Sequence, residues 1–232
     1  MKKLPLIIDK FLTLFKWPAA TLMVILLPAA INVYKIYPKY IGYNQKIFLL
    51  FLAGFCAFFG FKIFQGGGKL RTHFEITAHE LTHIFFAKLT FHKVTDIKVN
   101  DDGGEMSFEG IGNWLIVIAP YFFPTFCFIL MILISALKSY IPVDMHNAVI
   151  CAIGFFAGYH ANTVIAEIHP EQTDLKIVTY PFCLLFLPTA NLINFAYIMA
   201  FANNGWAGVG KVNQLLLYLT GKYIKDLFSF FF

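Results

Sequence analysis

Residues 74–91 read FEITAHELTHIFFAKLTF, and at their centre His79, Glu80 and His83 form an HExxH motif. The motif lies in a largely apolar run whose length is typical of a membrane helix. Each ionisable side chain placed in such a helix costs about 2.5–3.5 kcal/mol on insertion scales. Three of them within five residues need a compensating gain, and metal ligation supplies one.

The spacing of the motif predicts a zinc site. Histidines at positions i and i+4 lie one turn apart on the same helix face, so both imidazoles can reach one Zn²⁺. Glu80 would lie near the water that the zinc activates, where it can take up a proton and pass it to the leaving amine. We therefore expect His79 and His83 as metal ligands and Glu80 as the catalytic residue. The alternative is a buried polar cluster that pins neighbouring helices together.

The composition of the chain indicates a membrane protein. Of 232 residues, 59% are hydrophobic and only 13% are charged, whereas soluble domains carry about a quarter charged residues. A soluble monomer of this composition would expose large apolar patches. The net charge of +5 comes from lysines scattered between apolar runs, which is a poor pattern for nucleic-acid binding.

The apolar runs predict an all-α, multi-pass helical bundle with about six membrane spans and a small β-hairpin. The expected spans cover residues 17–34, 47–61, 74–91, 113–137, 146–168 and 177–202. A cleaved signal peptide is the alternative for the first of them. Alternating residues on both sides of Asp101–Gly104 predict the hairpin. The tail from Gly205 is expected to form an interfacial helix or a further crossing.

A third metal ligand must come from elsewhere, because catalytic zinc usually has three protein ligands and one open position. The candidates are His92, Glu105, His160, Glu167, His169, Glu171 and Asp174. Glu167 would serve in a membrane protease of the gluzincin type, although Pro170 argues against a helix that continues past it. Asp174 has a helix N-cap as its alternative role. His160 and Asn162 are candidates for positions beside the ligands or the substrate.

The order of these features resembles the site-2 protease family of intramembrane zinc metalloproteases. A membrane HExxH is followed by a hairpin, by a span that contains Ala119-Pro120, and by a late Asp, over about residues 74–202. The family's third ligand is an Asp far downstream, near the end of a membrane span, so the resemblance implies Asp174 in that role. Thr173-Asp174 looks like a divergent bacterial branch of the family.

The resemblance implies a zinc metalloendopeptidase that hydrolyses membrane-associated polypeptides in a bacterial cell membrane. Its partners would be the substrate and the lipid bilayer, with no nucleic acid, and any regulation would come from a membrane partner or the tail. We expect a two-span extension over 1–72, a metalloprotease-like core over 73–204 and a C-terminal helix over 205–232. The hairpin would add an extended substrate to its edge or act as a simple connector. A transporter or scaffold with a vestigial metal site is the non-enzymatic alternative.

Overall fold

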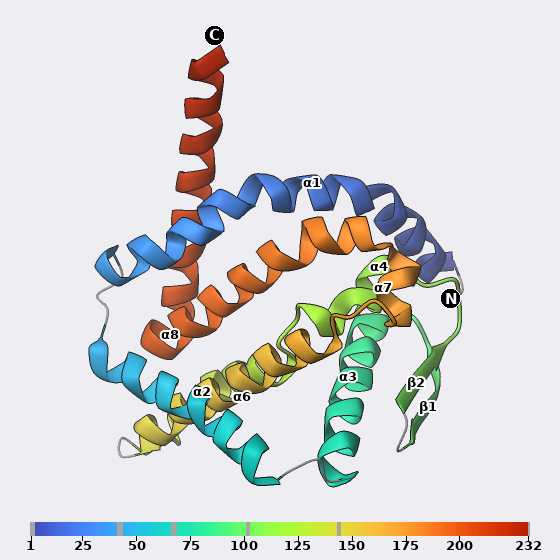
Figure 1. Ribbon diagram of the computed structural model, residues 1–232, viewed down its shortest axis with the longest axis horizontal. Helices are drawn as coiled ribbons and strands as arrows, with labels where there is room; N and C mark the ends of the chain where they lie inside the picture. The colour runs from blue at the N-terminus through green and yellow to red at the C-terminus, as the bar shows by residue number, and fades with distance from the viewer. Residues whose placement is uncertain (1–2, 41–43, 66–68, 101–102, 143–144, 232) are drawn as a thin grey trace.

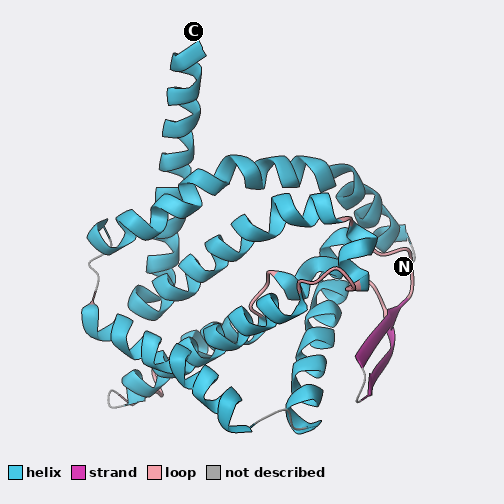
Figure 2. Ribbon diagram, in the orientation of Figure 1, coloured by secondary structure: helices cyan, strands magenta, loops and turns pink. Residues whose placement is uncertain are grey.

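The computed structural model describes residues 3–40, 44–65, 69–100, 103–142 and 145–231 (Figure 1). Most of them are helical (Figure 2), so the predicted fold class is confirmed. The long helices are α1 (Lys3–Tyr40), α2 (Gln45–Gln65), α3 (Lys69–Leu89), α5 (Thr125–Leu137), α6 (His146–Glu167) and α8 (Tyr180–Phe231). The short elements are β1 (Val94–Asn100), β2 (Gly103–Phe108), α4 (Trp114–Ile118), the 3₁₀ turn η1 (Ala119–Tyr121) and α7 (Thr173–Val178).

The number of candidate membrane spans is lower than expected. Within the described ranges, four helices are long and apolar enough to cross a membrane, namely α1, α2, α6 and α8. The helix pair around η1 adds a fifth candidate, bent by 84°. Helix α3, expected as the third span, is not among them. The charged side chains of Glu75, Glu80 and Lys88 interrupt its apolar run.

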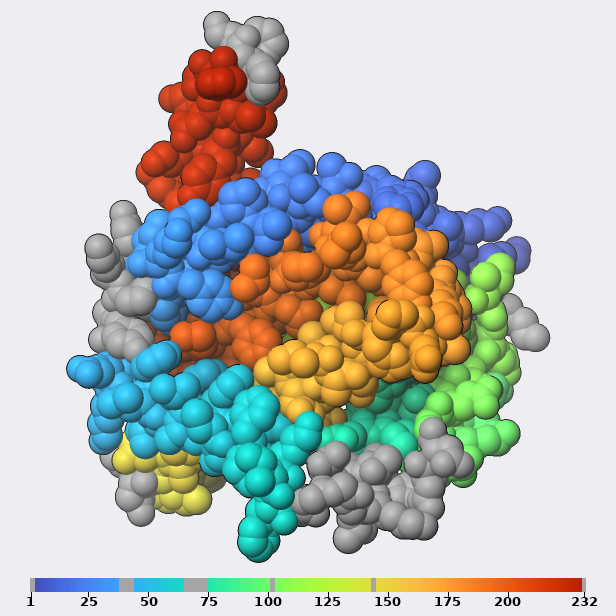
Figure 3. Space-filling model, in the orientation of Figure 1, coloured from blue at the N-terminus to red at the C-terminus, as the bar shows by residue number. Residues whose placement is uncertain are grey.

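Two helix pairs make up the frame of the bundle, with α1 packed along α8 and α2 along α6. Helix α8 bends at Asn204 and Gly205, where the backbone leaves the helical conformation. Beyond the bend it packs on α1 through Val212 and Leu216, and its end then runs away from the body (Figures 1 and 3). The tail is therefore helical, in agreement with both alternatives for it.

The chain between α4 and α5 is a broken helix that receives hydrogen bonds from α8. Prolines at the break prevent regular helical bonding, and unpaired backbone groups are costly in apolar surroundings. Asn191 Nδ2 donates to the carbonyl of Tyr121 at 2.9 Å, and Asn194 Nδ2 donates to the carbonyl of Phe122 at 2.9 Å. These bonds stabilise the break and place Tyr121 in the interior, fully buried.

Strands β1 and β2 form an antiparallel hairpin, as predicted. In the register of the two strands, Lys98 lies opposite Glu105. Asp101 and Asp102, expected in the turn, lie outside the described residues. Both strands pack against α3, so β2 lies beside the helix that carries the HExxH motif.

Helices α2 and α6 approach so closely that their contact depends on glycine. A Cβ atom at Gly54 would lie 1.9 Å from the Cys151 carbonyl oxygen, and one at Gly154 would lie 2.0 Å from the Phe51 carbonyl oxygen. No real side chain tolerates such distances, so the two backbones are in contact only because these positions lack a Cβ.

We predict that Gly154→Ala lowers the stability of the protein by about 1–3 kcal/mol, because the added methyl group forces the two helices apart. Thermal unfolding of the purified chain in detergent measures the effect. Gly60→Ala on α2 is the matched control, since a Cβ there meets nothing within 4 Å and alanine favours the helix. Equal melting temperatures for Gly154→Ala and the wild type would contradict the close packing.

Candidate metal centre

Helix α3 brings the two histidines of the motif together. His79 and His83 lie one turn apart, and their Nε2 atoms are 3.0 Å from each other. Both side chains are buried, with 9% and 8% of their surface exposed. The Nε2 atoms of both imidazoles therefore face the same point, as the spacing predicts.

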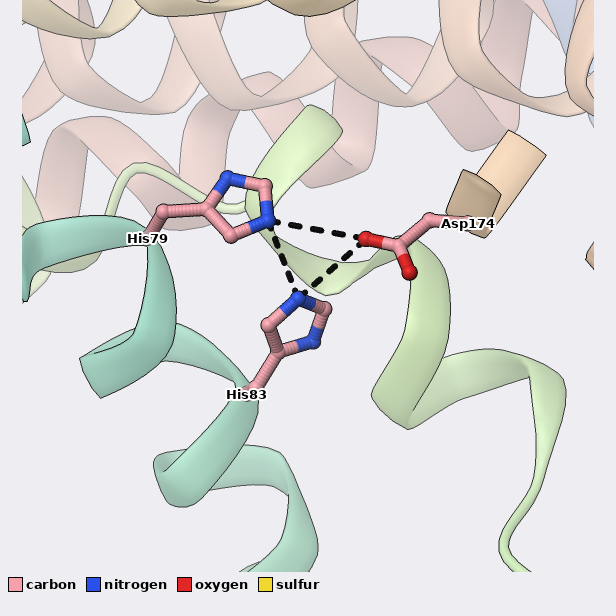
Figure 4. A group of neighbouring side chains, drawn as sticks. All are labelled: His79, His83 and Asp174. Atoms are coloured by element: carbon pink, nitrogen blue, oxygen red, sulfur yellow. Dashed lines mark hydrogen bonds and ion pairs between the residues drawn. The ribbon is translucent and has the colours of Figure 1, made fainter. Parts of the chain in front are cut away.

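Helix α7 brings Asp174 to the same point. Its Oδ2 atom lies 3.5 Å from His79 Nε2 and 3.3 Å from His83 Nε2 (Figure 4). In a tetrahedral zinc site with bonds of about 2.0–2.1 Å, neighbouring ligand atoms are roughly 3.3 Å apart. The N-cap of α7 is Gln172, so Asp174 does not occupy the alternative capping position. His79, His83 and Asp174 form a group that could hold a metal ion.

The hydrogen bonds of the other ring nitrogens determine the histidine tautomers. His83 Nδ1 lies 2.8 Å from the Ile116 carbonyl oxygen, and His79 Nδ1 lies 2.6 Å from Glu167 Oε2. Both partners are acceptors, so each Nδ1 carries a hydrogen and donates it. In the neutral form that binds a metal, the Nε2 lone pairs then face each other and the Asp174 carboxylate. Such an arrangement of bases is repulsive by itself and is the deprotonated donor set that a zinc ion requires.

Glu167 contacts His79 on the ring nitrogen that faces away from Asp174. It is the last residue of α6, so the helix ends before Pro170, as expected. A carboxylate on the outer nitrogen of a ligand histidine orients the ring and raises its basicity. The geometry therefore favours Glu167 as the partner of His79 over the direct ligand of the gluzincin alternative.

Tyr121 and Gln172 also belong to the centre, although they were not predicted from the sequence as site residues. Gln172 Nε2 donates to the Tyr121 hydroxyl oxygen at 2.6 Å, and the Tyr121 hydroxyl donates to Asp174 Oδ2 at 3.0 Å. The tyrosine ring also lies edge-on to His79, with 5.4 Å between ring centroids. A signal was available for both, because Tyr121 follows the Ala119-Pro120 pair directly and Gln172 precedes Asp174 by two positions.

The surroundings of Asp174 keep its carboxyl group ionised. Burial by itself raises the pKa of this group, but with no metal bound, hydrogen bonds and charge interactions with protonated His79 and His83 outweigh burial and hold the pKa well below its usual range. A bound cation would replace those protons and favour the ionised carboxylate in the same way. Asp174 therefore presents an anionic oxygen to the point where the two Nε2 atoms meet.

Glu80 lines a cleft of about 680 Å³ together with the three candidate ligands. Strand β2 forms one wall of this cleft, and Gly104 lies directly against Glu80. A Cβ atom at Gly104 would come within 2.6 Å of Glu80 Oε1. Because Gly104 has no side chain, β2 leaves room for the Glu80 carboxylate in the cleft.

The two further site candidates on α6 are not part of the three-ligand group. His160 Nε2 lies 3.2 Å from Asn191 Oδ1, in the support of the broken helix, and His160 lines the same small cavity as His79. Asn162 accepts a hydrogen bond from Lys62 Nζ. Through these hydrogen bonds His160 connects α6 with α8 and Asn162 connects α6 with α2.

The remaining candidates for the third ligand are also placed elsewhere. His92 is bound to Asp9 of α1, Glu105 lies on β2 at the wall of the cleft, and His169 and Glu171 are exposed.

The fold and the centre define an integral membrane protein with a candidate His-His-Asp metal site in a cleft. Residues 52–159 match the family model described as Peptidase M50B-like, and the match supports a site-2 protease-like family for this chain. The matched segment includes the HExxH motif, the hairpin and the broken helix, and it ends before Glu167 and Asp174. The family implies a metallopeptidase. No curated protein and no solved structure matches the chain.

We predict that Asp174→Ala removes zinc binding, whereas Glu167→Ala weakens it about 10–100-fold, as loss of an outer partner of a ligand histidine does. Competition with a chromophoric chelator on the purified full chain measures both affinities. Glu171→Ala, an exposed change nearby, is the control and retains wild-type affinity. Loss of zinc in Glu167→Ala with retention in Asp174→Ala would make Glu167 the third ligand.

Proposed function

We propose that the chain is a membrane-embedded zinc metalloendopeptidase of the site-2 protease type, which hydrolyses peptide bonds of membrane-associated polypeptides. One observation carries the proposal. The Nε2 atoms of His79 and His83 and Oδ2 of Asp174 meet within 3.5 Å of one another, and all three residues line one cleft with Glu80. The family match supports the same reaction class.

The residues divide the chemistry between them. His79, His83 and Asp174 would hold the zinc ion, which when bound acts as a Lewis acid on the scissile carbonyl and the attacking water. Glu80 takes up the proton of that water as it attacks, and returns it to the leaving amine nitrogen.

The outer partners keep the ligands ready for this reaction. Glu167 and the Ile116 carbonyl hold both imidazoles in the tautomer that leaves Nε2 free. The Tyr121 hydroxyl, oriented by Gln172, holds Asp174. Side chains that are preorganised in this way do not have to reorient when the substrate enters.

The cleft combines the polar residues of the metal centre with apolar walls that suit the side chains of an extended segment. Its lining includes the apolar side chains of Ile76, Met106, Phe108, Ile111, Val117 and Ile177. In the described chain β2 pairs with β1 alone, so its second edge offers main-chain groups to which a substrate strand can add. A helical membrane substrate would have to unwind to bind there, which favours cleavage of locally extended polypeptide.

We predict that Glu80→Gln lowers the rate of cleavage by about 10²–10⁴-fold, because it removes the group that transfers the proton, while zinc stays bound. The measurement compares newly formed protein N-termini in membranes of cells that express the wild type or the variant, with the zinc content of each purified protein determined in parallel.

Glu171→Gln is the matched control, since it makes the same change at an exposed glutamate close to Asp174, and it retains the cleavage products. Identical cleavage products in the wild type and Glu80→Gln, with zinc bound to both, would refute the protease and favour a transporter or scaffold.

A further inference from the structure

A second polar cluster is buried where α1 meets the base of the hairpin. Asp9 of α1 is only 3% exposed, although it is a carboxylate. Its Oδ1 accepts a hydrogen bond from Asn113 Nδ2 at 2.8 Å, and its Oδ2 accepts from the Gly112 amide at 3.2 Å and from His92 Nε2 at 3.1 Å. Buried charges persist in proteins when they are fully hydrogen-bonded, and this carboxylate has three donors.

These three donors come from parts of the chain that surround the candidate metal centre. His92 lies between α3 and β1, Gly112 follows β2, and Asn113 begins α4. One carboxylate on α1 therefore ties together both ends of the hairpin and the start of α4. Helix α1 lies outside the segment that matches the family model.

A line of hydrogen bonds connects Asp9 with a candidate metal ligand. Asn113 donates to Asp9 through Nδ2, and its Oδ1 accepts from the Ile116 amide at 3.2 Å, which caps α4. The Ile116 carbonyl in turn accepts from His83 Nδ1 at 2.8 Å. Helix α4 has five residues, too few to be stable without such outside contacts. The position of the carbonyl that orients His83 thus depends on the cap, and the cap depends on Asp9.

We propose that Asp9 is a positioning residue of the metal centre, through which α1 sets the orientation and tautomer of His83. This inference rests on the proposed function, in which His83 is a zinc ligand. Loss of the Asp9–Asn113 bond lets α4 shift or fray, and His83 then loses the acceptor that holds its Nδ1 hydrogen.

The Asp9–Asn113 pair can be exchanged, which gives a sharp test. In Asp9→Asn an NH₂ group replaces one of the two carboxylate oxygens, so one hydrogen-bond donor faces another. In Asn113→Asp two carboxylates face each other across the same contact. The double variant Asp9→Asn with Asn113→Asp restores one donor opposite one acceptor, and it keeps an oxygen for the Ile116 amide and another for Gly112 and His92.

The experiment measures zinc affinity of the purified full chain by chelator competition, and the absorption spectrum of the cobalt(II)-substituted protein. We expect each single variant to bind zinc about 10-fold more weakly, with an altered cobalt spectrum. The double variant recovers affinity to within a few-fold of the wild type and recovers the spectrum. Should the single variants not fold, Asp9→Glu replaces them, since it keeps the charge but displaces the carboxylate.

Trp114→Phe distinguishes positioning from general stabilisation. Trp114 Nε1 donates to the Leu12 carbonyl at 2.6 Å, so the change removes another bond between α1 and α4 without touching the line to His83. It is expected to lower the melting temperature and to leave zinc affinity and the cobalt spectrum unchanged.

Three outcomes would overturn the inference. They are wild-type affinity in the single variants, no recovery in the double variant, and a loss of affinity in Trp114→Phe as large as in Asp9→Asn. A wild-type chain that binds no zinc would instead overturn the proposed function, on which the inference depends.

Discussion

The meeting of three bases between α3 and α7 is the constraint on which the rest of the structure depends. The Nε2 atoms of His79 and His83 face Asp174 Oδ2 at 3.0–3.5 Å, and the hydrogens of both rings point the other way. Without a cation this arrangement would repel itself in a poorly solvated interior. With a bound cation, the same distances match those between neighbouring ligand atoms of a tetrahedral zinc site.

Each of the three bases makes a further hydrogen bond to a different element. The carbonyl of Ile116 on α4 holds His83, Glu167 at the end of α6 holds His79, and Tyr121 of η1 holds Asp174. Helix α4 and η1 can make these contacts because the helix is broken between α4 and α5. Asparagines of α8 donate hydrogen bonds to the backbone carbonyls at the break. Polar groups that a membrane disfavours thus form a path from α8 through the broken helix to the centre.

The local parts of this centre could be predicted from the sequence. The i and i+4 spacing of His79 and His83 is a property of one helix, and the hairpin follows from local alternation. The prediction of Asp174 as the third ligand rested on the family resemblance. No local pattern in the sequence downstream of His83 shows which of several acidic residues lies beside the two histidines in the fold. Tyr121, Gln172 and Asp9 were missed for the same reason, since their partners are 51–104 positions away. The sequence predicted a span at α3, which is not among the candidate spans in the described residues because it carries the polar groups of the site.

The most direct test is the X-ray absorption spectrum at the zinc edge of the purified full chain, together with its zinc content. A centre made of His79, His83 and Asp174 predicts one zinc ion per chain, with nitrogen and oxygen ligands at about 2.0–2.2 Å and the outer-shell scattering of imidazole rings. A chain that binds no zinc, or zinc bound by sulfur at about 2.3 Å, would contradict the account.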